Sequence, residues 1–190
     1  MKDITDWPSG DQRFVPIGKR IKKVVHHPDT SELYYFKEPT ERYPWEFWNE
    51  IIAYEVGRVL GFNVLKYEAA VLNGVAGCLS KSMTESPLEE LIHGQQFMLR
   101  MLPTFETKKG SDHTFQLVED FFNSTNEKSH QLIINDFIEM LVFHAIIGNR
   151  DRHQQNWAII REIKIKNRTN KSLLNIFLKK ENFPDIVINA

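Results

Sequence analysis

The chain has 190 residues, of which 42% are hydrophobic and 26% charged, which suits one globular domain or two small lobes. Its formal net charge of −1 provides no electrostatic basis for direct binding to nucleic acid or to a membrane surface. The N-terminus lacks an apolar signal segment, and no apolar run approaches the roughly 18 residues that span a bilayer. The single cysteine, Cys78, excludes an internal disulfide, and together these features predict a cytoplasmic protein in a reducing compartment.

Positions 1–12 are mostly polar and contain Pro8 and Gly10, so we expect a loop or a loose N-terminus there. Beyond them, short runs of β-branched and aromatic residues predict a small antiparallel sheet. Its expected strands are residues 14–17, 21–25 and 33–37, with one turn at Gly18-Lys19-Arg20 and another at residues 26–31.

A helix is expected next, with Pro44 in its first turn and Gly61 at its end. Apolar residues between them recur with helical spacing and form one stripe, as in a helix that packs on a core. The stripe consists of Trp45, Trp48, Ile51, Ile52, Val56, Val59 and Leu60. Strands are expected at 63–72 and 75–81, because Asn73-Gly74 between them is typical of a hairpin turn.

The second half of the chain is expected to be mostly helical, with helices at residues 87–91, 114–122 and 131–147. The last of these is apolar on nearly every face, which predicts a buried helix in the larger lobe. The expected fold class is therefore α+β with two lobes. Residues 1–83 would form a β-rich N-lobe with one helix, residues 84–160 a partial helical C-lobe, and residues 161–190 an atypical basic tail rich in Asn and Lys.

A dense polar loop, residues 149–156, leaves the buried helix at Gly148 and is followed by an apolar strand that begins at Trp157. Such loops, held between two packed elements, are a common place for active-site residues. Here the loop carries a carboxylate at Asp151 and an amide at Asn156, five positions on. It is the strongest candidate for a functional site in the sequence.

Two upstream residues complete a set suited to phosphoryl transfer. Lys37 lies at the end of an expected strand, and Glu50 is the best placed acid on the helix that follows. Phosphoryl transfer depends mostly on positioning and on neutralising phosphate charge. A lysine held by a carboxylate can bind the phosphates, an aspartate can accept the proton of the attacking hydroxyl, and an asparagine oxygen can bind Mg²⁺. The turn at Gly18 could cover the phosphates with backbone amides.

Three motifs, in this order, resemble HipA-like serine/threonine kinases over roughly residues 14–160. The first runs from Tyr35-Phe36-Lys37-Glu38-Pro39 to Trp48-x-Glu50-Ile51-Ile52-Ala53-Tyr54-Glu55-x-Gly57-Arg58-x-Leu60-Gly61. The second, Gly77-x-Leu79-Ser80-Lys81-Ser82, is similar to the end of the N-lobe and the entry to the hinge. The third, Gly148-Asn149-x-Asp151-Arg152-His153-x-x-Asn156-Trp157, is similar to the catalytic loop.

The resemblance implies a protein-kinase-like fold that uses ATP and Mg²⁺ to phosphorylate a protein Ser or Thr, and an antitoxin as a further partner. It implies that Lys37 binds the phosphates and that Glu50 is its ion-pair partner. Gly18 and Lys81 are the other expected nucleotide-binding residues. In the catalytic loop, Asp151 would be the base, His153 would brace the loop, and Asn156 would bind the metal.

One departure from the family concerns its second metal-binding aspartate, which lies in an Asp-x-Gly-type turn after the catalytic loop. No glycine follows Gly148. The only aspartate after the catalytic loop, Asp185, does not match the motif. The composition also changes after Glu162. We therefore hypothesise a truncated or frame-altered HipA-like protein with low turnover.

Two other functions remain open from the sequence. The chain could be a non-catalytic, pseudokinase-like protein that binds a nucleotide or a protein partner. It could also be a histidine-metal hydrolase or nuclease that uses Asp151, His153 and Asn156, although the other histidines show no metal-ligand spacing.

Overall fold

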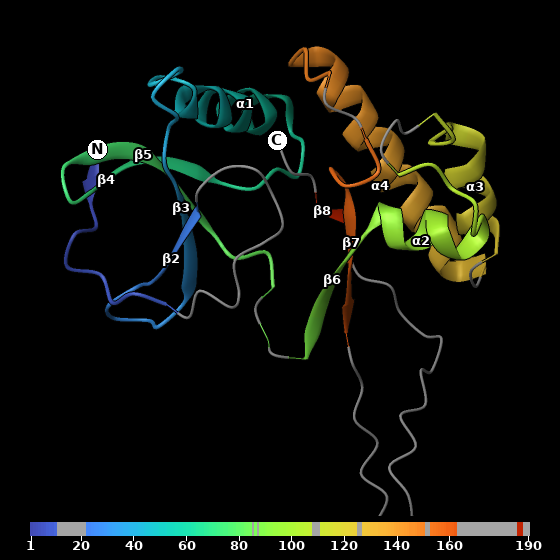
Figure 1. Ribbon diagram of the computed structural model, residues 1–190, viewed down its shortest axis with the longest axis horizontal. Helices are drawn as coiled ribbons and strands as arrows, with labels where there is room; N and C mark the ends of the chain where they lie inside the picture. Colours follow the sequence, from blue (N-terminus) through green and yellow to red (C-terminus); the bar gives the residue numbers. More distant parts are fainter. Residues whose placement is uncertain are drawn as a thin grey trace, which may run out of the picture. The chain divides into compact units, whose positions relative to one another are not determined.

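A computed structural model describes residues 1–10, 22–84, 86, 88–107, 111–124, 127–150, 153–162 and 186–187 of the chain (Figure 1). Its contacts divide the chain into two compact units, Met1–Glu85 with Ile188–Ala190 and Ser86–Val187. Each unit contains its own β-sheet, and the described helices belong to one unit or the other. Within the described part of the chain, no helix combines the length and the apolar composition needed to cross a membrane.

The first unit is built on a five-stranded sheet in the order β1-β4-β5-β3-β2. Its strands are β1 Lys2–Asp3, β2 Lys22–His26, β3 Leu33–Lys37, β4 Tyr67–Leu72 and β5 Val75–Lys81. The strands expected at 21–25, 33–37 and 75–81 are thus present, whereas β4 begins four residues later than expected. Asn73 and Gly74 form the hairpin turn with φ values of 51° and 78°, which the Asn-Gly pair tolerates. The strand expected at 14–17 lies outside the described residues.

The N-terminal segment, expected to be a loop or a loose terminus, is mostly loop but is held at both edges of the sheet. β1 pairs in parallel with β4 at one edge of the sheet, and Ser9 bridges Val25 of β2 at the other edge. Between these points Ile4 is fully buried, and Trp7 packs edge-on against Tyr34. The segment therefore crosses one face of the sheet and covers the core there. Two isolated apolar residues in a polar stretch have no periodicity, so the sequence pattern could not reveal this role.

Helix α1, Phe47–Leu60, packs on β4 and β5 (Figure 1) and ends at Gly61, whose φ of 81° forms the left-handed cap. Most of the expected apolar stripe does not face the sheet. Its members Trp45, Trp48, Ile52, Val59 and Leu60 are exposed, whereas Ile51 is partly buried against the sheet. The buried residues of the helix are Phe47, Ala53 and Gly57.

Two apolar clusters lie on the two faces of this sheet. One consists of Ile4, Val25, Phe36, Ala70, Leu72 and Leu79, under the N-terminal segment. The other, between α1 and the sheet, consists of Phe47, Tyr67 and Cys78 with the partly buried Ile51, Tyr54, Leu65 and Ala76 around them. Full burial of a large apolar side chain stabilises a fold by about 1.5–3 kcal/mol. These clusters hold the unit together and orient the polar side chains at their margins.

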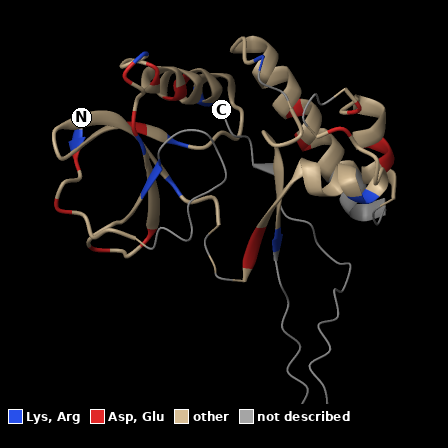
Figure 2. Ribbon diagram, viewed as in Figure 1, with Lys and Arg blue, Asp and Glu red and all other residues tan. Residues whose placement is uncertain are grey.

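Among its described residues, the second unit contains a three-stranded sheet in the order β6-β7-β8 and three helices. The strands are β6 Glu89–His93, β7 Ala158–Glu162 and β8 Ile186–Val187, and the helices are α2 Gly94–Met101, α3 Phe115–Asn123 and α4 Glu127–Ile146. The helix expected at 87–91 is wrong, because residues 89–93 pair with β7 as a strand. Figure 2 shows acidic residues at the start of β6 beside a basic residue of β7, and Arg161 and Glu90 form an ion pair there. A five-residue run is too short to reveal such a partner from its own sequence.

Helix α4 is less buried than its composition suggested. Its inner side, which includes Phe137 and Phe143, is buried, whereas Ile138, Val142 and Ile146 are exposed at 43%, 48% and 51%. These three residues recur every four positions and form an apolar stripe along one face. The expected buried helix is therefore buried along one side, and part of its apolar surface is exposed.

Candidate functional site

Lys37 and Glu50, the lysine and acid singled out in the sequence, meet in the first unit. Lys37 is the last residue of β3, and its Nζ lies 3.0 Å from Oε1 of Glu50 in the first turn of α1. Both side chains are mostly buried, with exposed fractions of 15% and 11%. The neighbouring acid Glu55, by contrast, pairs with Arg58 on the exposed side of the helix. The geometry thus distinguishes Glu50 from the other acids of α1.

A third group, the hydroxyl of Tyr67 on β4, completes this cluster. Its Oη accepts a hydrogen bond from Lys37 Nζ over 2.7 Å, and the ammonium also lies 4.5 Å from the centroid of the Tyr67 ring. Sheet register explains the meeting, because Lys37 pairs with Cys78 and Tyr67 pairs with Ser80, two residues further along β5. All of these side chains therefore point to the face that α1 covers. The sequence analysis missed Tyr67, since only the pairing of distant strands brings it here.

The protonation states of this cluster follow from its charges and burial. Burial by itself lowers the pKa of Lys37, but the neighbouring Tyr67 and Glu50 outweigh this effect and raise the pKa above its ordinary value. Burial raises the pKa of the Tyr67 hydroxyl, although Lys37 opposes it. At neutral pH the ammonium is therefore charged and the phenol is protonated. The cluster thus keeps the Lys37 ammonium charged and in a defined position, and a charged donor is what a phosphate oxygen needs.

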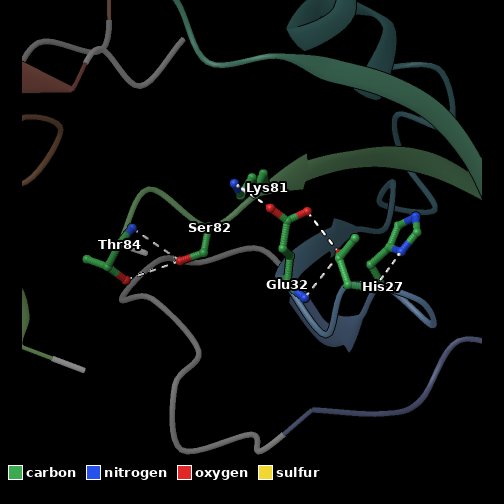
Figure 3. A network of polar contacts seen from close by, with 6 residues as sticks. His27, Glu32, Lys81, Ser82 and Thr84 are labelled. Carbon is green, nitrogen blue, oxygen red and sulfur yellow. Dashed lines mark hydrogen bonds and ion pairs between the residues drawn. The ribbon is translucent and has the colours of Figure 1, made fainter. Parts of the chain in front are cut away.

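Lys81, the other lysine expected at a nucleotide, belongs to a different set of contacts (Figure 3). It lies opposite Tyr34 in the sheet, on the face away from α1, and its Nζ is 2.8 Å from Glu32 Oε1. Glu32 also accepts a hydrogen bond from the hydroxyl of Thr30, and these contacts lower the pKa of its carboxyl group, with Lys81 the larger cause. The structure does not bring Lys81 to Lys37. Gly18 lies outside the described residues.

The loop that precedes β7 carries the remaining expected residues, in the second unit. α4 is followed by Gly148, which has a φ of 69°, and Asp151 lies outside the described residues. His153 Nδ1 accepts the backbone N–H of Gln155 over 3.2 Å, and its carbonyl accepts that of Asn156 over 2.9 Å. These two bonds close a tight turn from His153 to Asn156. The role of His153 as a brace for the loop stays a prediction, as does metal binding by Asn156.

Backbone hydrogen bonds hold this loop against the junction of β6 and α2. The N–H of Gln95 donates to Gln154 O over 2.7 Å, and the N–H of Gly94 donates to Trp157 O over 2.9 Å. The buried Gln154 side chain in turn donates from Nε2 to Thr107 O over 2.8 Å. The sequence analysis missed these supports because it predicted neither β6 nor α2.

Trp157 anchors the far end of the loop in the core of the second unit. The side chain is buried among Phe97, Phe122 and Phe137, and its Nε1 donates to Nε2 of His113 over 3.0 Å. A Cβ atom at Gly94 would lie 2.1 Å from the Trp157 ring, so the close approach of α2 requires glycine there. The loop position is therefore determined by packing as well as by hydrogen bonds.

The chemistry of these side chains suits a nucleotide and a hard cation. A charged lysine held by a carboxylate suits phosphate oxygens, and the Asn156 amide oxygen is a ligand type that Mg²⁺ accepts. Among the described residues, His, Cys, Asp and Glu side chains form no group of three that could bind a metal. This statement does not cover Asp151 and Asp185, because both lie outside the described residues.

Comparisons with known proteins agree with a kinase-like chain. No protein-family model matches. The chain is 24% identical over 144 residues to Y4dM of Sinorhizobium fredii, described as a candidate kinase, across 69% of this chain and 34% of Y4dM. The crystal structure of the proinflammatory kinase CtkA of Helicobacter pylori matches with a TM-score of 0.69 and 21% identity, across 85% of this chain and 54% of CtkA. The chain has a mixed α+β, kinase-like fold and spans less than two thirds of either protein.

Proposed function

We propose that this chain carries the nucleotide-binding and catalytic part of a HipA-like kinase, which transfers the γ-phosphoryl group of ATP to a Ser or Thr hydroxyl of a protein. The observation that carries the proposal is the mostly buried contact of Lys37 with Glu50. A strand lysine held by a helix acid is the arrangement that places an ammonium at nucleotide phosphates. The kinase-like fold and the relatives that the chain resembles support the same function.

Each residue has a role that its chemistry supports. Lys37 binds phosphate oxygens and stays charged because Glu50 accompanies it. Asp151 orients the acceptor hydroxyl and takes up its proton, which is the task of the aspartate in kinase catalytic loops. His153 keeps the loop turn in shape, and Asn156 contributes an oxygen ligand to Mg²⁺. When bound, Mg²⁺ neutralises charge on the β- and γ-phosphates.

The resemblance of the loop motif to HipA-like kinases supports a toxin–antitoxin context, in which a second protein restrains the kinase. It also supports action in the cytoplasm, where ATP and protein substrates are present. These finer statements belong to the proposal and rest on the motif residues 148–157. Co-purification of the tagged chain with the product of an adjacent gene would test the antitoxin partner, and the absence of a stable complex would count against it.

A second candidate function is nucleotide binding without phosphoryl transfer. It is favoured by the Lys37–Glu50 contact taken alone, which suits phosphate binding and does not itself require phosphoryl transfer. A chain of this kind would bind ATP and raise its thermal stability, because a ligand that binds only the folded state stabilises it. It would not transfer phosphate.

The two candidates are separated by one set of assays on the full chain. Transfer of labelled phosphate from ATP and Mg²⁺ is measured for the native chain, for Asp151→Asn and for Lys37→Ala, and thermal unfolding is measured with and without ATP. The kinase proposal expects incorporation by the native chain alone. Equal incorporation by the native chain and Asp151→Asn would refute catalysis by Asp151, and ATP-induced stabilisation without any incorporation would establish the second candidate.

A further inference from the structure

Tyr67 is one of two hydrogen-bond acceptors that fix the orientation of the Lys37 ammonium. An ammonium has three N–H donors. Among the described residues, the Glu50 carboxylate accepts one over 3.0 Å and the Tyr67 hydroxyl accepts another over 2.7 Å. One N–H is then left for a further acceptor. Two fixed partners on different elements also define the direction in which that last N–H points.

Tyr67 is well placed to be the fixed partner of the two. Its side chain is only 2% exposed and packs with Phe47 and Cys78 between α1 and the sheet. It is the first residue of β4 and pairs with Ser80 of β5 in the five-stranded sheet. Glu50, by contrast, depends on the position of α1. The Tyr67 hydroxyl therefore restrains Lys37 relative to the sheet itself, and the Tyr67 ring beneath the ammonium adds a cation–π contact.

We propose that Tyr67 is a positioning residue for nucleotide phosphates: its hydroxyl holds the second N–H of Lys37, so that the third is directed to a phosphate oxygen. This inference rests on the proposed function and adds to it a residue that acts through Lys37 rather than on the nucleotide. Loss of the hydroxyl alone leaves the ammonium with one hydrogen-bonded partner and more rotational freedom. Phosphate binding then weakens, because the ligand must restrict the motion of the Lys37 side chain when it binds, and this loss of side-chain entropy reduces the affinity.

The test is to substitute Tyr67→Phe, which keeps the ring, its packing and the cation–π contact while removing the hydroxyl. Tyr54→Phe is the matched control, since Tyr54 packs on the same cluster and no contact joins it to Lys37 among the described residues. Calorimetry on the full chain measures the affinity for Mg²⁺·ADP and, separately, for adenosine. Adenosine lacks phosphates, so a change confined to ADP identifies an effect exerted through Lys37. A general loosening of the fold would weaken both ligands.

We expect Tyr67→Phe to weaken Mg²⁺·ADP binding by about tenfold, the size typical of one hydrogen bond to a charged group. Adenosine binding should be unchanged, and Tyr54→Phe should match the native chain for both ligands. The inference is overturned if Tyr67→Phe binds ADP as tightly as the native chain while Lys37→Ala loses ADP binding. If Lys37→Ala itself binds ADP normally, the phosphate-binding role of Lys37 fails, and the proposed function fails with it.

Discussion

The Lys37 cluster in the first unit and the loop before β7 in the second are held in place by different forces. In the cluster, Glu50 of α1 and Tyr67 of β4 hold the ammonium of Lys37, which belongs to β3, through charge and hydrogen bonds. In the loop, backbone groups and a packed Trp157 hold the chain path. The cluster should therefore be sensitive to changes of single polar atoms, whereas the loop should be sensitive to changes of shape.

The largest effect on stability is expected at the loop. Gly94→Ala would place a Cβ atom 2.1 Å from the Trp157 ring, and we expect it to lower the free energy of unfolding by about 3 kcal/mol. Gly61→Ala is the matched control, because position 61 has open space around it and only its φ of 81° opposes a side chain. That control should cost about 1 kcal/mol. Urea unfolding measures both, and equal losses would show that packing on Trp157 does not determine the loop.

The cluster should respond in activity. Lys37→Met keeps the length of the apolar stem but removes the charge, and we expect phosphoryl transfer to fall by about a hundredfold, or about 2.7 kcal/mol in the barrier. Lys66→Met is a control, since Lys66 pairs with Glu68 at an exposed site and should retain full activity. Initial rates of phosphate incorporation decide the matter. Similar rates for the two variants would mean that the cluster has no special role.

Alkaline pH should lower the free energy of unfolding through the Lys37 cluster rather than through the loop. The folded-state pKa values of Tyr67 and Lys37 are both raised, so the folded chain retains protons that the unfolded chain loses above the ordinary tyrosine pKa of 10.0. Stability contributed by these groups is therefore complete below that pH and is lost as the pH rises, by up to about 1.4 kcal/mol per pH unit for each group. Chemical unfolding between neutral pH and pH values above 10.0 should show a shallower decline for Tyr67→Phe than for the native chain. An identical decline would contradict the assignment.

The smallest effect is expected for the side-chain contact at the loop surface. Gln155 Nε2 donates to Gln95 Oε1, and Gln155 is exposed, so Gln155→Ala should change the free energy of unfolding by no more than about 0.5 kcal/mol. The backbone bond from Gln95 N–H to Gln154 O remains in this variant. Urea unfolding next to Gly94→Ala gives the comparison. A loss as large as that of Gly94→Ala would show that side chains, rather than backbone and packing, hold the loop.

Local sequence was sufficient where an element carries its own signal. Runs of β-branched and aromatic residues predicted β2 and β3, the Asn73-Gly74 pair predicted the hairpin, and the helical pattern at 114–122 predicted α3. The expected meeting of Lys37 and Glu50 also appears in the structure. These features depend on residues close together in the chain, or on a strand and the helix that directly follows it.

Only the tertiary structure decided which faces and distant segments meet. It turned most of the apolar stripe of α1 outward and left one face of α4 exposed. It also made β6 a strand through its pairing with β7, and it placed the N-terminal segment across the sheet. It also brought the Tyr67 hydroxyl to Lys37, thirty positions earlier in the chain. The physical reason is the same in each case: burial and strand pairing are gained only against a partner that lies far away in sequence, and a local pattern of residues does not identify that partner.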